Sequence, residues 1–163
     1  MMRVFAGGML IATLIMVGCG GGRESASEGD PIGRVDRGQL TERFLAAYDT
    51  VHVPSDYVGL IQQAGAGVET MVFFGQWCSD SRRDVPRFLK IVDLAGTSLG
   101  RVTLYALDRK KKSPEGLEGQ YRIERVPTFV FLKQGKEIGR IVEMPRTTLE
   151  GDMLGILAAG MHQ

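Results

Sequence analysis

Residues 71–81 read MVFFGQWCSDS, and this stretch joins two different patterns. Its first four residues are apolar and mostly β-branched or aromatic, which predicts a short buried strand that continues to Gly75. Beyond it, apolar side chains recur at the i, i+3, i+4 and i+7 spacing of one helix face: Val85, Phe88, Leu89 and Val92. Cys78 is therefore expected where a strand ends and a helix begins.

This position favours an ionised thiol. The first N–H groups of a helix have no partner within the helix, and the helix dipole places partial positive charge there. Arg82 and Arg83, about one turn further on, are expected to add positive charge. Asp80 either opposes them or simply favours the start of the helix. Since positive surroundings lower the pKa of a cysteine below the ~8.5 of a free thiol, Cys78 is a candidate nucleophile.

These residues resemble the active-site segment of the thioredoxin superfamily, which carries Trp-Cys-x-x-Cys at a strand-to-helix junction. Ser81 stands where the second cysteine would be. Pro86 matches the proline within the family's active-site helix and is expected to bend it, and Val126-Pro127-Thr128 resembles its cis-proline loop. The resemblance covers most of residues 37–160. It implies an α/β fold, the thioredoxin-like three-layer sandwich with a central mixed sheet and helices on both faces.

The resemblance also implies a chemistry, with one change. In two-cysteine members a thiolate attacks a disulfide, and the second thiol then releases the product. Ser81 cannot release it, although its hydroxyl is expected to donate a hydrogen bond to the sulfur of Cys78. The buried acid that many members carry six residues before the cysteine is Val72 here. Both changes are consistent with monothiol exchange, isomerisation or capture of protein or small-molecule thiols, and equally with a decayed site.

Three further residues are expected to contact a partner. In the family, the residue before the cis-proline pairs with an extended substrate, which implies this role for Val126 and Pro127. Trp77 either shapes a substrate groove or packs over the start of the helix. A second function remains open on the same fold: a binding or scaffold module without redox activity, because a fold alone does not establish a function.

Other classes of chemistry fit less well. Peroxiredoxin-like peroxidases place Thr or Ser three residues before their reactive cysteine, where this chain has Gly75. His52 and His162 do not form a metal-ligand spacing with Cys78. There is no P-loop and no dinucleotide fingerprint, so no metal or cofactor is expected.

The first residues have the pattern of a secretory signal. Arg3 precedes an apolar segment at residues 4–17 that is too short to span a bilayer. Residues 14–19, Leu-Ile-Met-Val-Gly-Cys, resemble the lipobox of bacterial lipoproteins, which implies a signal peptide at 1–18 and lipidation of Cys19. The alternative is an ordinary signal peptide or retained anchor. The resemblance implies a membrane-anchored lipoprotein of the bacterial cell envelope that faces the periplasm. Gly20 stands in place of the aspartate that retains many lipoproteins at the inner membrane, which favours the outer membrane in a cell that has one.

The domain organisation follows from this. Residues 19–36 are rich in Gly, Ser and Glu and are expected to form a flexible tether, with the thioredoxin-like domain at 37–163. Of the two cysteines, lipidation would use Cys19. Cys78 then has no partner in its own chain, in a compartment that favours disulfides. Its thiol is either buried and inert or kept for reaction.

Charge argues against a nucleic-acid partner. Without Arg3, the count of Lys and Arg falls from 20 to 19, equal to the 19 Asp and Glu, so the mature chain is formally neutral. The basic run at 109–112 is interpreted as a solvated loop, or as a patch for a membrane surface or an anionic partner.

The remaining elements are expected from periodicity and turn residues. They are a helix at 39–48, a strand at 51–53, a helix from Ser55 to about 64, the active-site helix to about 94, a strand at 101–107, a helix or turn at 121–123, a hairpin of strands 128–132 and 137–142, and a last helix with Thr147 as N-cap.

Overall fold

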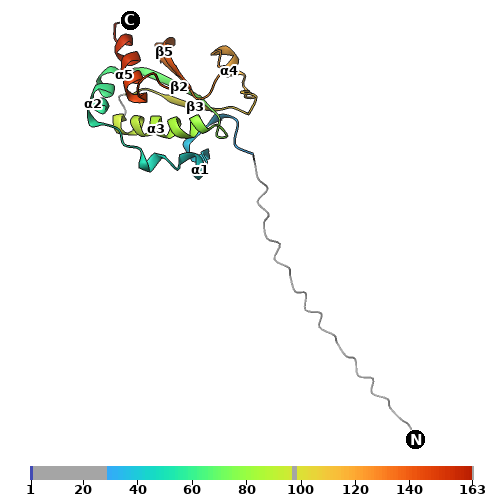
Figure 1. Ribbon diagram of the computed structural model, residues 1–163. Helices are drawn as coiled ribbons and strands as arrows, with labels where there is room; N and C mark the ends of the chain where they lie inside the picture. Colours follow the sequence, from blue (N-terminus) through green and yellow to red (C-terminus); the bar gives the residue numbers. More distant parts are fainter. Residues whose placement is uncertain (2–28, 97–98, 163) are drawn as a thin grey trace.

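A computed structural model describes residues 1, 29–96 and 99–162 of the 163-residue chain. Within these residues a five-stranded sheet has the order β1-β3-β2-β4-β5 (Figure 1). β2 is parallel to β3, and the other neighbours are antiparallel. The expected mixed sheet is therefore confirmed. Its strands are β1 (Gly33–Val35), β2 (Val68–Phe74), β3 (Val102–Ala106), β4 (Thr128–Lys133) and β5 (Lys136–Val142).

Helices cover both faces of the sheet, but unequally. Side chains alternate between the faces along a strand, so Val72 and Phe74 of β2 face one cluster of buried residues, whereas Phe73 faces another. The first cluster receives side chains from α1 (Glu42–Leu45), α2 (Ser55–Ala64), α3 (Ser79–Ala95) and α5 (Leu149–Gly160). The second is covered by the segment that contains α4 (Leu117–Gln120).

α3 is the active-site helix that the sequence predicted. It begins directly after Cys78, which is its N-cap residue, and it continues through the buried Pro86. It ends at Gly96, which has a φ of 66° and donates its N–H to the carbonyl of Val92. This positive φ suits glycine, which has no Cβ. The helix therefore starts and stops where the sequence indicated.

The β4–β5 hairpin also agrees with its prediction. Lys133 pairs with Lys136 across a two-residue turn of Gln134 and Gly135. Both turn residues have positive φ, 50° and 76°, as a tight hairpin turn requires. The hairpin places Thr128, at the start of β4, next to the loop that carries Pro127.

The region before β2 differs from its prediction. The expected tether at 19–36 includes β1, which pairs antiparallel with β3, so the sheet begins before residue 37. The strand expected at 51–53 is wrong: these residues lead from a 3-10 turn, η2 (Tyr48–Thr50), into α2, and Val53 is buried in the core. The helix expected at 39–48 is shortened to α1, preceded by a 3-10 turn, η1 (Arg37–Gln39). The signal peptide and Cys19 lie outside the described residues.

The start of α5 is one residue later than expected. The N-cap is Thr148, whose hydroxyl oxygen accepts a hydrogen bond from Gly151 N at 3.1 Å. Thr147, the predicted N-cap, instead donates its hydroxyl to Asp152 at 2.8 Å. The helix or turn expected at 121–123 is confirmed as a turn at Tyr121 and Arg122, directly after α4, which ends at Gln120. In the described ranges, the search for a helix both long and apolar enough to cross a bilayer finds none.

The burial of side chains from α5 indicates how much they contribute to the free energy of unfolding. Leu157 is fully buried against the sheet, whereas Leu94 of α3 keeps 44% of its surface exposed. We expect Leu157→Ala to lower the free energy of unfolding by about 2–5 kcal/mol, since a cavity is left. Leu94→Ala removes the same atoms and should cost under about 1 kcal/mol. Urea unfolding measures both, and equal losses would contradict the described packing.

Candidate active site

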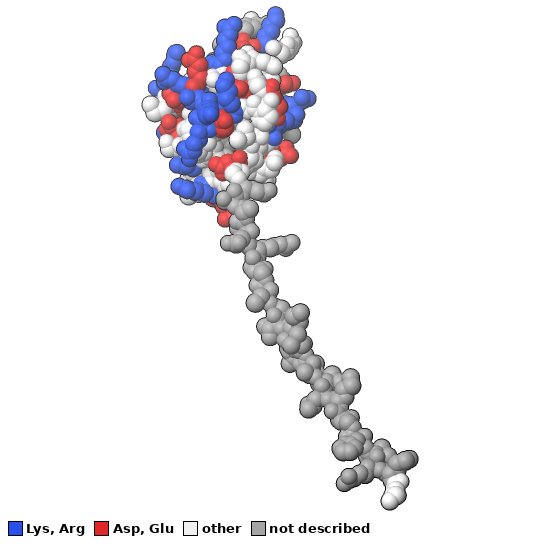
Figure 2. Space-filling model, turned by 90° about the vertical axis from the view of Figure 1, so that its right-hand side faces the viewer, with Lys and Arg blue, Asp and Glu red and all other residues white. Residues whose placement is uncertain are grey.

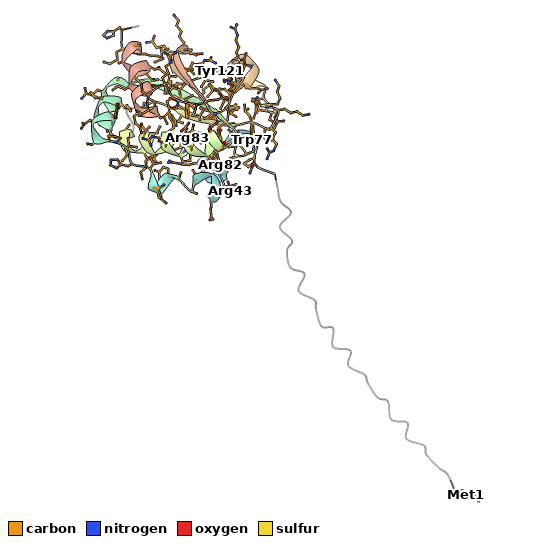
Figure 3. The ribbon with its side chains drawn as sticks, viewed as in Figure 1. Met1, Arg43, Trp77, Arg82, Arg83 and Tyr121 are labelled. Carbon is orange, nitrogen blue, oxygen red and sulfur yellow. The ribbon has the colours of Figure 1, made fainter. Side chains whose placement is uncertain are left out.

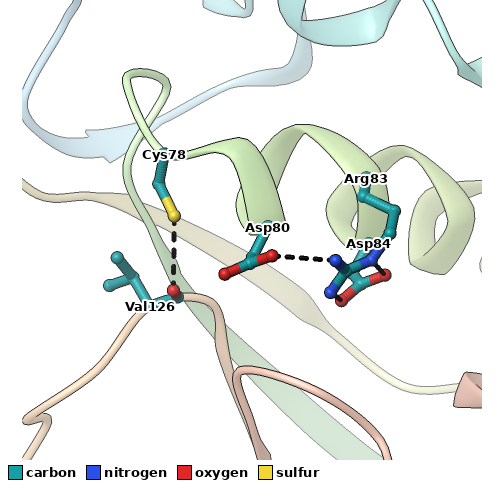
Figure 4. A network of polar contacts seen from close by, with 5 residues as sticks. All are labelled: Cys78, Asp80, Arg83, Asp84 and Val126. Atoms are coloured by element: carbon teal, nitrogen blue, oxygen red, sulfur yellow. Dashed lines mark hydrogen bonds and ion pairs between the residues drawn. The ribbon is translucent and has the colours of Figure 1, made fainter.

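Cys78 lies at the junction of β2 and α3, with its side chain half-buried. Its N–H donates to the carbonyl of Gly75 at 2.9 Å, and its own carbonyl accepts the first hydrogen bond of α3, from Arg82 N at 3.1 Å. Its thiol donates to the carbonyl oxygen of Val126, with 3.4 Å between Sγ and oxygen (Figure 4). The Val126–Pro127 peptide bond is cis. The fold thus brings Cys78 close to Val126 and Pro127, the two predicted partner-binding residues, which follow it by 48 and 49 positions in the sequence.

The side chain of Trp77, next to Cys78 in the sequence, is held in place by a hydrogen bond and by packing. Its indole Nε1 donates to the carbonyl of Leu107 at 2.9 Å, just beyond the end of β3. A Cβ at Gly75 would lie 2.5 Å from the indole, so the missing side chain lets the ring lie against the turn. The guanidinium of Arg109 lies 5.6 Å from the centre of the ring, a cation–π distance. Trp77 therefore packs over the turn, and it also lines a pocket.

Ser81 has a different hydrogen-bond partner from the one expected. The residue is fully buried. Its hydroxyl oxygen accepts from Gly75 N at 3.3 Å, which ties the first turn of α3 to the end of β2. The serine thus supports the turn that carries Cys78. Val72, in place of the family's buried acid, is also fully buried and packs in the core.

Arg83 does not add uncompensated charge near the thiol, contrary to expectation. Its guanidinium bonds both oxygens of the buried Asp84, at 2.8 and 2.7 Å, and Asp80 at 2.8 Å (Figure 4). The hydrogen bonds to Asp84 hold the pKa of Arg83 above its usual value, although burial opposes this. Two carboxylates therefore offset this arginine. The charge of Asp80 is in turn partly offset by Arg83.

Arg82 is placed differently. Its Nη1 donates to the carbonyl oxygens of Gln76, at 3.3 Å, and Trp77, at 3.2 Å. Among the described residues, no ion pair engages it. Arg82 is thus the arginine of this pair that keeps an unpaired positive charge, and it binds the backbone of the turn directly.

Sequence reasoning missed two residues of this region. Gln76 is buried, and its Oε1 accepts from Thr41 N at 2.9 Å, which joins the turn to the start of α1. A polar residue between an apolar strand and Trp77 was the available signal. Arg109 belongs to the basic run at 109–112, for which the sequence left open a solvated loop or a patch for a membrane surface or an anionic partner. Only the fold shows that its guanidinium lies over Trp77. His52 and His162 belong to no cluster of three or more metal-ligating side chains within the described ranges.

Arg83→Gln tests the electrostatic account of the site. The substitution leaves the buried Asp84 without its guanidinium, so we expect unfolding to require about 1–3 kcal/mol less. Alkylation of Cys78 by neutral iodoacetamide should stay within about twofold of the original rate, because the lost charge was already compensated. Arg101→Gln, at an exposed arginine away from the site, is the matched control. A severalfold fall in alkylation rate for Arg83→Gln alone would contradict the account.

Comparisons with known proteins agree with this geometry. The family model described as Thioredoxin matches residues 35–153. A thioredoxin of Chlamydia trachomatis is 30% identical over 77 residues, which cover 47% of this chain and 70% of the relative. A thioredoxin-like protein of Acanthamoeba polyphaga mimivirus is 26% identical over 96 residues, covering 59% of this chain and 67% of the relative.

The fold is also found among solved structures. A Pseudomonas aeruginosa protein of unknown function has a TM-score of 0.53 at 18% identity, over 74% of this chain and 81% of that chain. At this identity the likeness concerns the fold alone. Sequence family, sheet order and the position of Cys78 beside Pro127 all point the same way, and the chain belongs to the thioredoxin family.

Proposed function

We propose that this protein performs monothiol thiol–disulfide exchange or isomerisation through a mixed disulfide on Cys78. The observation that carries the proposal is the position of the sulfur: half-buried, at the N-terminus of a 17-residue helix, and 3.4 Å from the carbonyl of Val126. Members of the thioredoxin family act on protein thiols. Cys78 resembles their reactive cysteine, since it follows a tryptophan at a strand-to-helix junction, and this supports the same role for it. A half-buried sulfur keeps part of its surface for a partner disulfide.

The proposed reaction balances without a cofactor. Cys78 loses its proton, and the thiolate attacks one sulfur of a partner disulfide. A bond forms between the two sulfurs, the partner disulfide breaks, and the other partner sulfur leaves as a thiolate that takes up a proton. Ser81 has no sulfur, so the mixed disulfide is released by an external thiol. When a different thiol of the same partner, not the one just released, attacks the partner sulfur of the mixed disulfide, a new partner disulfide forms. The bond to Cys78 breaks, Cys78 leaves as a thiolate, and the net result is isomerisation.

Val126 and Trp77 are proposed to receive the partner. In the reduced protein the thiol of Cys78 donates to the carbonyl of Val126. Loss of the thiol proton removes this bond and leaves the carbonyl free to accept from an extended partner chain. Trp77, held by the carbonyl of Leu107, forms a fixed wall on the other side of the sulfur-bearing turn.

The proposed setting is the bacterial cell envelope. The lipobox-like residues 14–19 support lipidation of Cys19 after removal of residues 1–18. The Gly- and Ser-rich residues that follow support a tether between membrane and domain. Gly20 after the cysteine supports the outer membrane as the destination in a cell that has one.

Replacing Ser81 tests the monothiol reaction. With dithiothreitol as reductant, the original chain should reduce insulin disulfides little faster than dithiothreitol alone, since each mixed disulfide waits for an external thiol. Ser81→Cys places a second thiol one helical turn from the first, and we expect at least about a tenfold gain in turnover. Ser81→Ala is the control and should show no gain. Rapid turnover by the original chain would be incompatible with the proposed mechanism.

Cys19→Ser tests the anchor separately. Expressed in a bacterium with its own leader, the original chain should sediment with membranes and carry the mass of an acylated N-terminal cysteine. The serine variant should lack the acyl mass and leave the membrane fraction. Membrane association and mass unchanged by the substitution would rule out lipidation at this residue.

A scaffold without redox activity is the second candidate. One observation favours it: Cys78, Asp80, Arg83 and Asp84 all have internal hydrogen-bond partners (Figure 4). In that case the Cys78→Ala variant should still bind the partner, and neither the original protein nor the variant should reduce insulin disulfides. Loss of partner capture in Cys78→Ala would instead favour the exchange reaction.

A further inference from the structure

A pocket of about 370 Å³ opens beside Trp77. Three of its lining residues are arginines from separate segments: Arg43 of α1, Arg82 of α3 and Arg109 of the loop after β3. Figure 3 shows Arg43, Arg82 and Trp77 at the same end of the molecule. Figure 2 looks onto that end and shows groups of Lys and Arg side chains with acidic ones between them. The other lining residues are Asp30, Thr41, Phe44, Gln76 and Trp77.

The positive charge of this pocket is not balanced by ion pairs. Elsewhere in the described residues, Arg37, Arg83, Arg87, Arg125 and Arg140 each have a carboxylate partner. Within those same residues, the three pocket arginines have none. Asp30 is the acidic lining residue, and it is exposed. A pocket with three cations and one exposed anion favours an added negative charge.

Gln76 adds an independent sign of a missing ligand. Its side chain lines the pocket and is 5% exposed. Because Oε1 accepts from the N–H of Thr41, the orientation of the amide is fixed, and Nε2 is the donor end. In the part of the chain that the structure describes, Nε2 is a buried side-chain donor without a partner. A buried donor left unpaired is costly, so an acceptor that enters against Gln76 would be stabilised.

The ligand chemistry follows from these groups. The guanidinium groups of the arginines and the side-chain N–H of Gln76 are all hydrogen-bond donors. They therefore suit a negatively charged ligand that has only hydrogen-bond acceptors. A carboxylate meets both requirements and matches the planar guanidinium. We propose that this pocket binds a carboxylate side chain of the partner protein, and that the partner is an acidic segment around its reactive cysteine.

The pocket lies next to Cys78, so its carboxylate ligand is expected to come from the protein that reacts with Cys78. This step rests on the proposed function. Trp77 lines the pocket, and Cys78 is the next residue. A partner cysteine bonded to Cys78 therefore has its neighbouring residues close to the pocket wall. Each extended residue spans about 3.3–3.6 Å, so an acidic residue within a few positions of that cysteine can reach the arginines.

A pair of activated peptides tests this inference. Both are seven-residue peptides with a central cysteine carried as a 2-thiopyridyl disulfide. In one peptide, the two residues before the cysteine and the two residues after it are glutamate. In the other peptide, the same four residues are glutamine. With Cys19→Ser protein, whose only thiol is Cys78, pyridinethione release gives the rate. We expect the glutamate peptide to react about tenfold faster at low salt, the gain of one charge-assisted contact.

Substitutions then locate the effect. In Arg43→Gln/Arg109→Gln the rate ratio of the two peptides should fall close to one, and the ratio cancels any change in the reactivity of the thiol that both peptides share. Arg101→Gln/Arg146→Gln removes the same charge from exposed positions outside the pocket and should keep the ratio. A ratio near one for the original protein, or an equal fall in both double variants, would overturn the inference.

Equilibrium binding separates this inference from the proposed reaction. The same peptides with serine in place of cysteine are titrated against Cys78→Ala protein. Tighter binding of the glutamate peptide, lost in Arg43→Gln/Arg109→Gln, supports the pocket even if Cys78 proves unreactive. Equal binding of both peptides refutes the pocket, and it does so whether or not Cys78 forms mixed disulfides.

Discussion

The structure depends on the backbone turn at residues 75–78, between the central strand β2 and the 17-residue helix α3. Several hydrogen bonds fix it: Gly75 N to Ser81 Oγ, Cys78 N to Gly75 O, and the indole of Trp77 to Leu107 O. Arg82 binds two of its carbonyls, and Gln76 ties it to Thr41. Because these hydrogen bonds join the turn to α1, α3 and the loop after β3, they position Cys78 beside the carbonyl of Val126.

The two faces of the sheet carry buried clusters of unequal size. The large cluster beneath α1, α2, α3 and α5 contains most of the buried apolar side chains. Trp77 and Cys78 instead pack, as Tyr121 does, against the smaller cluster, which includes Phe73 and Val126. The candidate site thus lies where the smaller cluster meets the start of α3, apart from the large cluster.

The sequence predicted the parts in which local pattern and tertiary structure agree. Residues 71–96 were predicted well because a buried strand, a capping position, a helical repeat and Gly96 follow one another directly. β1 was missed because three residues are too few to show a periodicity. The β-branched residues Val51 and Val53 suggested a strand, but no strand pairs with them and Val53 is used in the core. The pocket could not be predicted, because Arg43, Arg82 and Arg109 come together only in the fold.

The central claim is that Cys78 is a nucleophile in the folded protein, and one measurement tests it most directly. Cys19→Ser protein is incubated under native conditions with bis(2-hydroxyethyl) disulfide, which is small and neutral, and its intact mass is followed. The account predicts one mixed disulfide per folded chain, removed completely by added dithiothreitol. An adduct that forms only after unfolding in urea would contradict the account and leave a thioredoxin fold used for binding alone.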